Sequence, residues 1–438
     1  MFYRKISQDI LQYFNKVNDP ILLVDGARQV GKTYIIRKIG KENFKNFIEI
    51  NLANDFAGNK YFNSVKTIEQ FYNQLTAFYG NKLGNISNTL IFLDEIQVYP
   101  ELLTLLKPLR EDGKFRYICS GSQLGVSLRR TSLIPVGSVS KIRMYPMDFE
   151  EFLLANGIAK DAISSLKLSF YDLTPQIDAM HDYYMSLFKT YLIVGGLPGV
   201  VKTYIEDKNI ARVRQAQTQI KSFYEEDASQ YDDQHRLKIK RIYNVMASTL
   251  ENKVKRMQIK SIEDKKYAKF EQYSNEFEYL ISSGIALECR AISEPKFPLL
   301  QSQEKNLLKL YYNDVGILTN ILFKNNINPI LNTQAGVNLG SVYETVVAQE
   351  LLAHHEKLFY FDKRKFGEVD FLIDDYDNLC PLPIEVKSGR DYLNYKAMPK
   401  MLEDVNYKMA KGIVLSNERQ VFMRGKILHL PIYYVMFL

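Results

Sequence analysis

Residues 26–33 form the most chemically definite string in the chain, Gly-Ala-Arg-Gln-Val-Gly-Lys-Thr. Glycines in the pattern G-x-x-x-x-G-K-T let the backbone curl, so that successive N–H groups point at one phosphate chain. Lys32 can then reach the β- and γ-phosphates of a nucleotide, and Thr33 can place its hydroxyl on a magnesium ion. The string therefore predicts a site for ATP and Mg²⁺. A chance glycine loop is the alternative interpretation.

Two carboxylates, Asp94 and Glu95, directly follow the apolar run Leu-Ile-Phe-Leu. A buried parallel strand of this kind delivers its carboxyl end to the sheet edge where a phosphate loop also lies. We expect Asp94 to hold Mg²⁺ and Glu95 to orient or deprotonate the attacking water. Glu95 and Lys32 are therefore the expected catalytic residues. Two acids that simply end a strand are the structural alternative.

Other polar side chains are candidates for contact with the γ-phosphate. Ser120 ends the apolar run Tyr-Ile-Cys, and we expect its strand to lie between the two strands that carry the nucleotide motifs. A simple turn is the alternative. An arginine near the γ-phosphate can accelerate hydrolysis, and Arg129, Arg130 and Arg143 are candidates unless they are surface charges. The residues expected to contact the nucleotide are Gly26, Ala27, Arg28, Gln29, Val30, Gly31, Lys32, Thr33, Tyr34 and Ser120.

A second group of carboxylates lies near the end of the chain. Asp370 stands on one apolar run, and Glu385 and Lys387 stand on the next, two residues apart and therefore on one face of a strand. Glu344 follows a glycine at the start of a helical pattern. This spacing is typical of metal-dependent nucleases, in which Asp370, Glu385 and Glu344 would bind Mg²⁺ and Lys387 would act as the catalytic lysine. Exposed acid–lysine pairs on strands are the alternative.

The first 150 residues alternate short apolar runs with helical periodicity, which predicts a mostly parallel sheet covered by helices on both faces. On the helix over 67–79, Phe71 and Phe78 are expected to face inward. Strands are predicted at 20–25, 44–52, 88–95, 115–120 and 139–147, and helices at 4–17, 34–40, 67–79 and 100–111.

The pattern changes after Pro146. Residues 150–230 are predicted to be mostly helical, with a break near 195–199. From 236 to 330, three helices and a hairpin resemble a winged helix in size and order. The last hundred residues return to an α/β pattern, with a helix over 341–355 and strands near 358–361, 367–373 and 382–387.

Positive charge gathers in residues 236–270, which hold eleven lysines and arginines against three acids. The resulting balance of +8 exceeds the net charge of +7 for the whole chain. Such a segment attracts phosphate backbones, so DNA is a candidate partner. A solvated helix face is the alternative.

The remaining composition is that of an ordinary globular protein, with 46% hydrophobic and 24% charged residues among 438. No apolar run approaches the length of a membrane span, and the first residues lack a signal-peptide core. We therefore expect a cytoplasmic protein without a membrane partner. Three distant cysteines suggest neither a disulfide framework nor a metal site.

The order of several motifs resembles that of prokaryotic AAA-type ATPases that carry a C-terminal domain of unknown function. The resemblance departs at Ala27, where that family often has Pro, and at Ser138, where it often has Arg. It rests on residues 26–33, Leu-Asp-Glu-Ile-Gln at 93–97, Ser-Gly-Ser at 120–122, Tyr-Pro-Met-Asp-Phe-Glu-Glu-Phe at 145–152, Asn313-Asp314, and the Glu344, Asp370, Glu385 and Lys387 set.

The resemblance implies an α/β fold in four parts. An AAA-type, three-layer P-loop domain is expected over 1–150 and a helical lid or linker over 151–235. A winged-helix-like domain is expected over 236–330, and a restriction-endonuclease-like α/β domain over 335–438. ATP and Mg²⁺ are the implied cofactors.

Three functions follow as alternatives. The first is Mg²⁺-dependent ATP hydrolysis coupled to DNA association through the C-terminal half. The second is an ATP-dependent, Mg²⁺-requiring DNA nuclease. The third is an ATP-switched regulator that binds protein partners, in which the nuclease-like domain is inactive and serves only as an interaction surface.

Overall fold

The computed structural model describes residues 2–14, 21–54, 61–83, 88–122, 137–227, 233–263, 269–332, 337–355, 357–389 and 391–438. These residues form two compact units. The N-terminal unit comprises Tyr3–Tyr145 together with Ser282–Gly284, and the C-terminal unit comprises chiefly Pro146–Ile281 and Ile285–Leu438.

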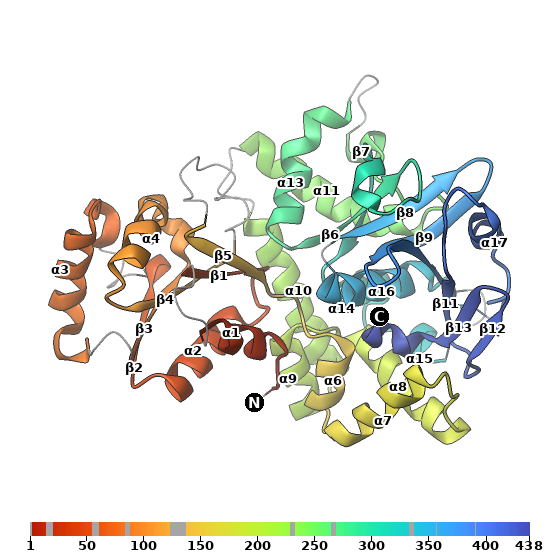
Figure 1. Cartoon of the computed structure of the whole chain (residues 1–438), viewed down its shortest axis with the longest axis horizontal. Helices are drawn as coiled ribbons and strands as arrows, with labels where there is room; N and C mark the ends of the chain where they lie inside the picture. The colour runs from red at the N-terminus through yellow and green to blue at the C-terminus, as the bar shows by residue number, and fades with distance from the viewer. Residues whose placement is uncertain are drawn as a thin grey trace. The chain divides into compact units, whose positions relative to one another are not determined.

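A five-stranded parallel sheet forms the centre of the N-terminal unit (Figure 1). Its strand order is β2-β3-β4-β1-β5, so β4 lies between β1 and β3, as predicted. In this register Cys119 of β4 is paired with Leu23 of β1 and with Leu93 of β3. The carboxyl ends of the three strands therefore meet at one edge. The strands are β1 (Ile21–Asp25), β2 (Asn46–Asn51), β3 (Thr89–Asp94), β4 (Arg116–Gly121) and β5 (Val139–Arg143).

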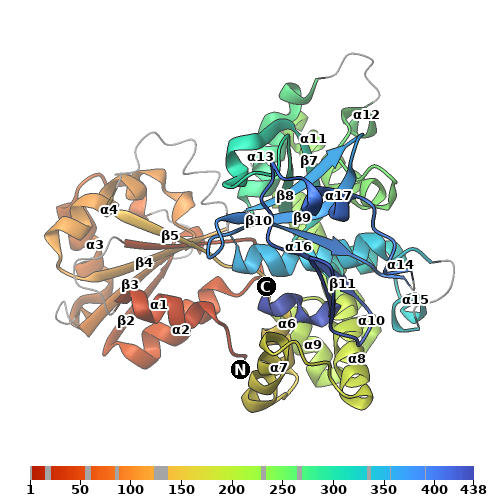
Figure 2. The ribbon, with the colours of Figure 1, turned by 45° about the vertical axis from the view of Figure 1, so that its right-hand side comes forward.

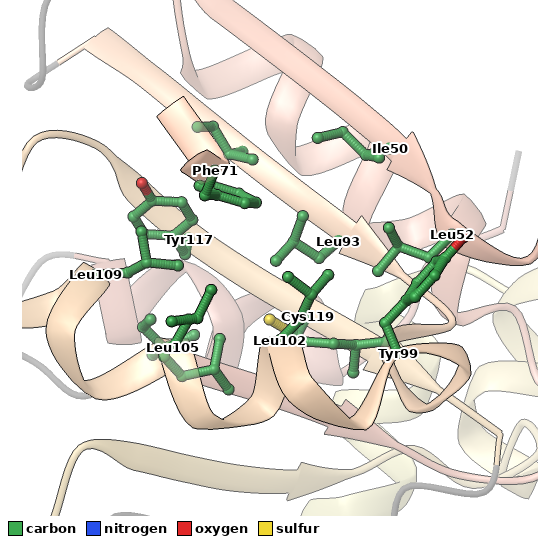
Figure 3. Packing of buried hydrophobic residues seen from close by; sticks show 14 of the residues in the cluster. Ile50, Leu52, Phe71, Leu93, Tyr99, Leu102, Leu105, Leu109, Tyr117 and Cys119 are labelled. Atoms are coloured by element: carbon green, nitrogen blue, oxygen red, sulfur yellow. The ribbon is translucent and has the colours of Figure 1, made fainter. Parts of the chain in front are cut away.

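Helices cover both faces of this sheet, with α1 and α2 on one side and α3 and α4 on the other (Figures 1 and 2). Leucines of α4 and Phe71 of α3 pack against Leu93, Tyr117 and Cys119 of the strands (Figure 3). This three-layer arrangement matches the fold expected for the N-terminal part. The helices are α1 (Ile6–Phe14), α2 (Lys32–Asn43), α3 (Ile68–Tyr79) and α4 (Pro100–Asp112).

Phe78 corrects one sequence expectation about α3. It is 37% exposed and packs at its edge on Tyr61, with ring centroids 5.0 Å apart, whereas Phe71 is fully buried. The Thr67 and Gln70 side chains form a capping box at the start of the helix. In its last turn Tyr79, the residue after Phe78, packs against the core, and Phe78 lies at the rim.

The C-terminal unit begins with a helical region, as predicted. Its first break separates α8 from α9, where the backbone N–H of Gly196 donates a hydrogen bond to the buried Asp314 carboxylate across 2.6 Å. Asp314 also caps a later helix by accepting from Ile317. The helices are α6 (Phe149–Ala155), α7 (Lys160–Tyr171), α8 (Asp178–Val194), α9 (Pro198–Asp207), α10 (Ile210–Asp227), α11 (Asp233–Glu251), α12 (Ile259–Ile262), α13 (Ser274–Ser282), α14 (Val315–Phe323) and α15 (Asn328–Leu331).

Within the described parts of the chain, no single helix is long and apolar enough to cross a bilayer. Helices α8 and α9 meet the length and composition criteria only as a pair, and their axes are bent by 119°.

An eight-stranded mixed sheet completes the C-terminal unit (Figure 2), in the order β12-β13-β11-β10-β9-β8-β6-β7. The β6–β7 hairpin pairs with β8 through a parallel ladder. The segment expected to be a winged helix and the segment expected to be nuclease-like therefore share one sheet, and their division into two domains stays a proposal. The strands are β6 (Ala286–Ile292), β7 (Gln303–Tyr312), β8 (Leu358–Lys363), β9 (Gly367–Asp375), β10 (Cys380–Val386), β11 (Gly412–Ser416), β12 (Phe422–Arg424) and β13 (Ile427–Pro431).

Helices α16 (Gly340–His354) and α17 (Ala397–Glu403) are among those that pack on this sheet. Helix α17 buries Met398 and Met401 against strand residues that include Phe361 and Val369. Helix α16 contacts β6, β7, β8 and β10 and is buried from Ser341 to Leu352. A helix that is buried all round makes any charged residue on it costly unless that residue is paired. Glu344 is such a residue.

Candidate functional site

The loop between β1 and α2 has the backbone conformation that its glycines allow. Gly26 has φ +147°, and a Cβ there would lie 2.3 Å from the carbonyl oxygen of Met144. Gly31, which precedes α2, lies in the left-handed region with φ 98°. These conformations aim the first N–H groups of α2 at the loop's concave side, where the helix dipole also favours an anion. Arg28 and Gln29 at the tip are exposed.

Lys32 is buried at the centre of this loop, with 6% of its surface exposed. Its ammonium group donates hydrogen bonds to the carbonyl oxygens of Gly26 and Ala27, each across 2.8 Å. Burial lowers the pKa of Lys32, which the carboxylates of Glu95 and Asp25 partly oppose. The Lys32 ammonium group is thus held inside the loop at 26–33, where a phosphate chain would bind.

Asp94 joins the two nucleotide motifs. Thr33 Oγ1 donates to Asp94 Oδ2 across 2.9 Å, and Ser120 Oγ donates to the other oxygen, Oδ1. Burial raises the pKa of Asp94, while the bonds from Ser120 and Thr33 lower it. A hydroxyl and a carboxylate oxygen in contact are a donor pair suited to a hard cation such as Mg²⁺. The residues present therefore fit the ion that the loop implies.

Glu95 lies one residue beyond β3 in the left-handed region, with φ 57°. Gln97 Nε2 donates to its Oε2 across 2.5 Å, and Ser122 Oγ lies 3.3 Å from the same oxygen. These neighbours fix the carboxylate beside the edge at which β1, β3 and β4 end. Ser120 is completely buried, and Tyr34, on α2, is 47% exposed. Their expected contacts with nucleotide stay predictions.

Two basic side chains pair with a buried carboxylate at the start of the loop. Asp25 is fully buried, and its Oδ2 lies 2.9 Å from both Lys141 Nζ and an Arg143 guanidinium nitrogen. Its Oδ1 has no hydrogen-bond partner in the described part of the chain. Arg143 also donates to the Ser282 carbonyl oxygen. This arginine, a candidate for the γ-phosphate, therefore already has a carboxylate partner; Arg129 and Arg130 lie outside the described residues.

Arg4 supports the loop from the other side. It is 6% exposed and donates to the carbonyl oxygens of Val30 and Tyr145, across 2.8 and 2.7 Å. Val30 is a loop residue, so this contact fixes loop backbone to the segment after β5. Nothing in the sequence near Arg4 indicated this role.

The C-terminal unit brings the four predicted residues of the second group together. Glu344 on α16 and Glu385 on β10 are buried, Asp370 on β9 is half-buried, and Lys387 Nζ lies 3.4 Å from Glu385 Oε2. Asp370 Oδ2 accepts the backbone N–H of Val386 across 2.9 Å. Burial and the charge of Asp370 raise the pKa of Glu385 well above its usual range.

Two further lysines, which the sequence did not single out, enter the same group. Lys255 Nζ pairs with Glu344 Oε1, whose second oxygen accepts from Tyr311 OH across 3.1 Å. Lys309 on β7 is 1% exposed and lies 2.5 Å from Glu368. Burial lowers the pKa of Lys309, but the charges of Glu344, Glu368 and Asp370 outweigh it and raise that pKa.

These contacts do not leave a carboxylate set open for a divalent ion. In the described ranges, no group of three or more His, Cys, Asp or Glu residues is arranged to hold a metal ion. Lys255 and Tyr311 engage the two oxygens of Glu344, Asp370 Oδ2 accepts the Val386 N–H, and Lys387 pairs with Glu385. The residues present do not fit Mg²⁺ as they stand, and the metal-binding role of this group stays a prediction.

Part of the basic segment is compensated within the fold. Four of its lysines and arginines pair with acids: Lys238 with Glu276, Lys240 with Glu225, Arg241 with Glu263, and Lys255 with Glu344. Lys253, Lys260 and Lys269 are exposed, whereas Lys265 and Lys266 lie outside the described residues.

The fold and site define a P-loop protein of the AAA type. Residues 18–153 match a family described as an AAA domain. Residues 185–328 and 339–435 match two families described as domains of unknown function, DUF8612 and DUF4143. The chain thus carries an N-terminal AAA ATPase domain followed by domains of unknown function, as the motif order indicated.

Solved structures similar to this chain include the Walker-type ATPase PABY2304 of Pyrococcus abyssi. It is 16% identical with a TM-score of 0.43, over 73% of this chain and 95% of that one. Cdc6p from Pyrobaculum aerophilum is 10% identical with a TM-score of 0.25, over 75% and 93% of the two chains. PCH-2 of C. elegans is 11% identical with a TM-score of 0.24, over 43% and 59%. No curated protein sequence matches the chain.

Proposed function

We propose that the protein binds ATP and hydrolyses it in a Mg²⁺-dependent reaction at the edge where β1, β3 and β4 end. The observation that carries this proposal is the direct contact of Thr33 with Asp94, at 2.9 Å. This contact joins the hydroxyl of the last residue of the phosphate loop to the carboxylate of the last residue of β3. The fold does not need a buried, desolvated carboxylate at this position, so the presence of Asp94 indicates a functional site.

Each residue then has a distinct task. The N–H groups of residues 26–33 and the Lys32 ammonium bind the phosphate chain, and Thr33 with Asp94 holds the cation. Bound Mg²⁺ neutralises charge on the phosphates and on the leaving oxygen. Glu95 orients a water molecule and accepts its proton as the water oxygen attacks the γ-phosphorus. The bond from that phosphorus to the ADP oxygen breaks, which yields ADP and inorganic phosphate.

Phosphate release from ATP tests this proposal in the wild type and in Lys32→Ala, with Lys41→Ala as a matched control. Lys41 lies on the same helix and is exposed. We expect Lys32→Ala to lower turnover by about 10²-fold or more, the scale for loss of a group that stabilises developing charge. Lys41→Ala should behave as wild type. Equal turnover in all three proteins would contradict the assignment.

DNA association through the basic segment is the second part of the proposal. Exposed Lys253 and Lys260 support it, while the four ion pairs within the fold leave less free charge than the sequence total suggests. A duplex that contacts these side chains would release counterions, so affinity should fall as salt rises.

Fluorescence anisotropy of a labelled duplex over a range of salt concentrations tests this association. Lys253→Ala with Lys260→Ala should reduce the slope of log affinity against log salt by about 2, or about one per phosphate contact. Lys202→Ala, an exposed lysine of α9, is the control. Absence of binding at low salt would favour the protein-binding regulator instead.

A further inference from the structure

The buried acidic group of the C-terminal unit has internal counter-ions. Three ammonium groups, of Lys255, Lys309 and Lys387, face the carboxylates of Glu344, Glu368 and Glu385, one pair to each. The fourth carboxylate, Asp370, accepts the backbone N–H of Val386. We call these seven residues the carboxylate–lysine cluster.

Its charge is already close to balanced. Four carboxylates and three ammonium groups leave one negative charge. A divalent ion would add two charges to a site in which Lys309 is 1% exposed and Glu344 and Glu385 are 4% exposed. Uncompensated charge in such surroundings is strongly disfavoured.

The geometry opposes a metal ion in the same way. Both oxygens of Glu344 are engaged, one by Lys255 and one by Tyr311. Lys309 comes from β7, a strand of the same sheet, and its buried ammonium group lies 2.5 Å from Glu368 Oε1. Its side chain also lies over the Tyr360 ring, 4.7 Å from the centroid.

We propose that Lys255 and Lys309 replace the divalent cation of this nuclease-like arrangement, so that the cluster is a metal-independent structural centre that does not cleave DNA. The inference concerns the C-terminal unit alone and does not depend on the proposed ATP hydrolysis. Because lysine ammonium groups, and not a metal ion, neutralise the carboxylates in this proposal, it argues against the nuclease alternative.

Removal of Lys255 should open a metal site. In Lys255→Met, Glu344 loses its counter-ion while the stem length is kept, so we expect a lower melting temperature that Mn²⁺ partly restores. Apparent Mn²⁺ affinity should rise by about tenfold or more, because the repulsion of one nearby positive charge is gone. Lys202→Met, at an exposed lysine of α9 in the same unit, is the matched control and should show no metal effect.

Mn²⁺ titrations of melting temperature, without nucleotide, make the comparison in full-length protein. Every variant also carries Asp94→Asn, so that the N-terminal unit cannot hold the ion. In this background, the parent protein, which carries only Asp94→Asn, should show no change in melting temperature when Mn²⁺ is added. A Mn²⁺ shift in the parent that Asp370→Asn abolishes would overturn the proposal. So would Mg²⁺-dependent nicking of supercoiled DNA by the wild type that Asp370→Asn abolishes.

A double variant covers the case in which Lys255→Met fails to fold. Lys255→Met with Glu344→Gln removes both partners, and replacing a buried pair together is far less costly than removing one member. We expect this double variant to be more stable than either single variant and to be insensitive to Mn²⁺. A double variant no more stable than the singles would show that Lys255 does not compensate Glu344, and would overturn the proposal.

Discussion

The hydroxyl of Thr33 donates a hydrogen bond to Asp94 across 2.9 Å, although 61 positions separate the two residues in the chain. The contact exists because β4 is inserted between β1 and β3, which brings the ends of all three strands to one edge. Ser120, at the end of β4, completes the arrangement by donating to the second oxygen of Asp94. Sheet order, rather than proximity in sequence, therefore builds the proposed cation site.

Asp94→Asn should separate metal binding from folding. Asn keeps the shape and one oxygen that can accept from Thr33 or Ser120, but it lacks the negative charge that a hard cation prefers. We expect Mg²⁺-dependent turnover to fall by about 10²-fold or more, with a melting temperature close to that of the wild type. Phosphate release at several Mg²⁺ concentrations measures this. Wild-type Mg²⁺ dependence in the variant would contradict the role of Asp94.

Glu95→Gln should separate ATP binding from hydrolysis. The variant keeps the side-chain shape but cannot accept the proton of water, and general-base loss costs about 10²–10⁴-fold in rate. ATP affinity should remain near the wild-type value, which filter binding or calorimetry can measure. Gln97→Ala, which removes a donor to Glu95, is expected to lower turnover by less. Retained turnover in Glu95→Gln would assign the base elsewhere.

Arg143→Ala should act mainly on stability. It removes one of the two cations that compensate buried Asp25, and Lys141 remains. We expect the free energy of unfolding of the N-terminal unit to fall by about 1–3 kcal/mol, as for a buried charge left with fewer partners. Arg37→Ala removes an exposed pair with Glu49 and should cost less than about 1 kcal/mol.

Urea unfolding followed by circular dichroism measures both variants, and phosphate release is measured on the same samples. An Arg143→Ala protein of full stability whose turnover drops about 10³-fold would instead identify Arg143 as the arginine that acts on the γ-phosphate.

His429 should make the C-terminal unit sensitive to acid. Its ring stacks on Phe422 with centroids 4.3 Å apart, its Nε2 lies 2.8 Å from Tyr395 OH, and burial lowers its pKa from 6.5 to about 4. The unfolded chain therefore takes up a proton before the folded chain does. The stabilising contribution is complete above pH 6.5 and is lost as the pH falls toward 4.

At pH 5 the loss should be about 1–2 kcal/mol. His429→Gln should remove this part of the pH dependence, so the difference between the unfolding free energies at pH 7 and pH 5 should be smaller than in the wild type. Urea unfolding at the two pH values measures it. An identical pH dependence in both proteins would show that His429 does not contribute.

The elements that position the nucleotide site could be predicted from local patterns. The strand that ends in Asp94 and the loop at 26–33 are short segments whose residue types already indicate binding of Mg²⁺ and phosphate. The position of β4 between β1 and β3 was expected for a sheet of this architecture. The shared face of Glu385 and Lys387 followed from strand alternation, and Asp370 was grouped with them by a spacing typical of metal-dependent nucleases.

The supporting residues could not be predicted in the same way. Arg4 reaches the Val30 carbonyl from a different element. Lys255, in the segment between α11 and α12, reaches Glu344, and Lys309 on β7 reaches Glu368. Tertiary packing determines their partners. The sequence around a single Arg or Lys does not indicate which distant buried acid it will pair with. Phe78 fitted an inward-facing pattern, but the neighbouring Tyr79 packs against the core and Phe78 is left exposed.

Calorimetric titration of the wild-type protein with ATP and Mg²⁺ tests the central claim most directly, with Lys32→Ala titrated beside it. The account predicts saturable one-to-one binding by the wild type and a loss of affinity of about tenfold or more in Lys32→Ala, where the cation that faces the phosphates is gone. Absence of binding by folded wild-type protein, or equal affinity in the two proteins, would contradict it.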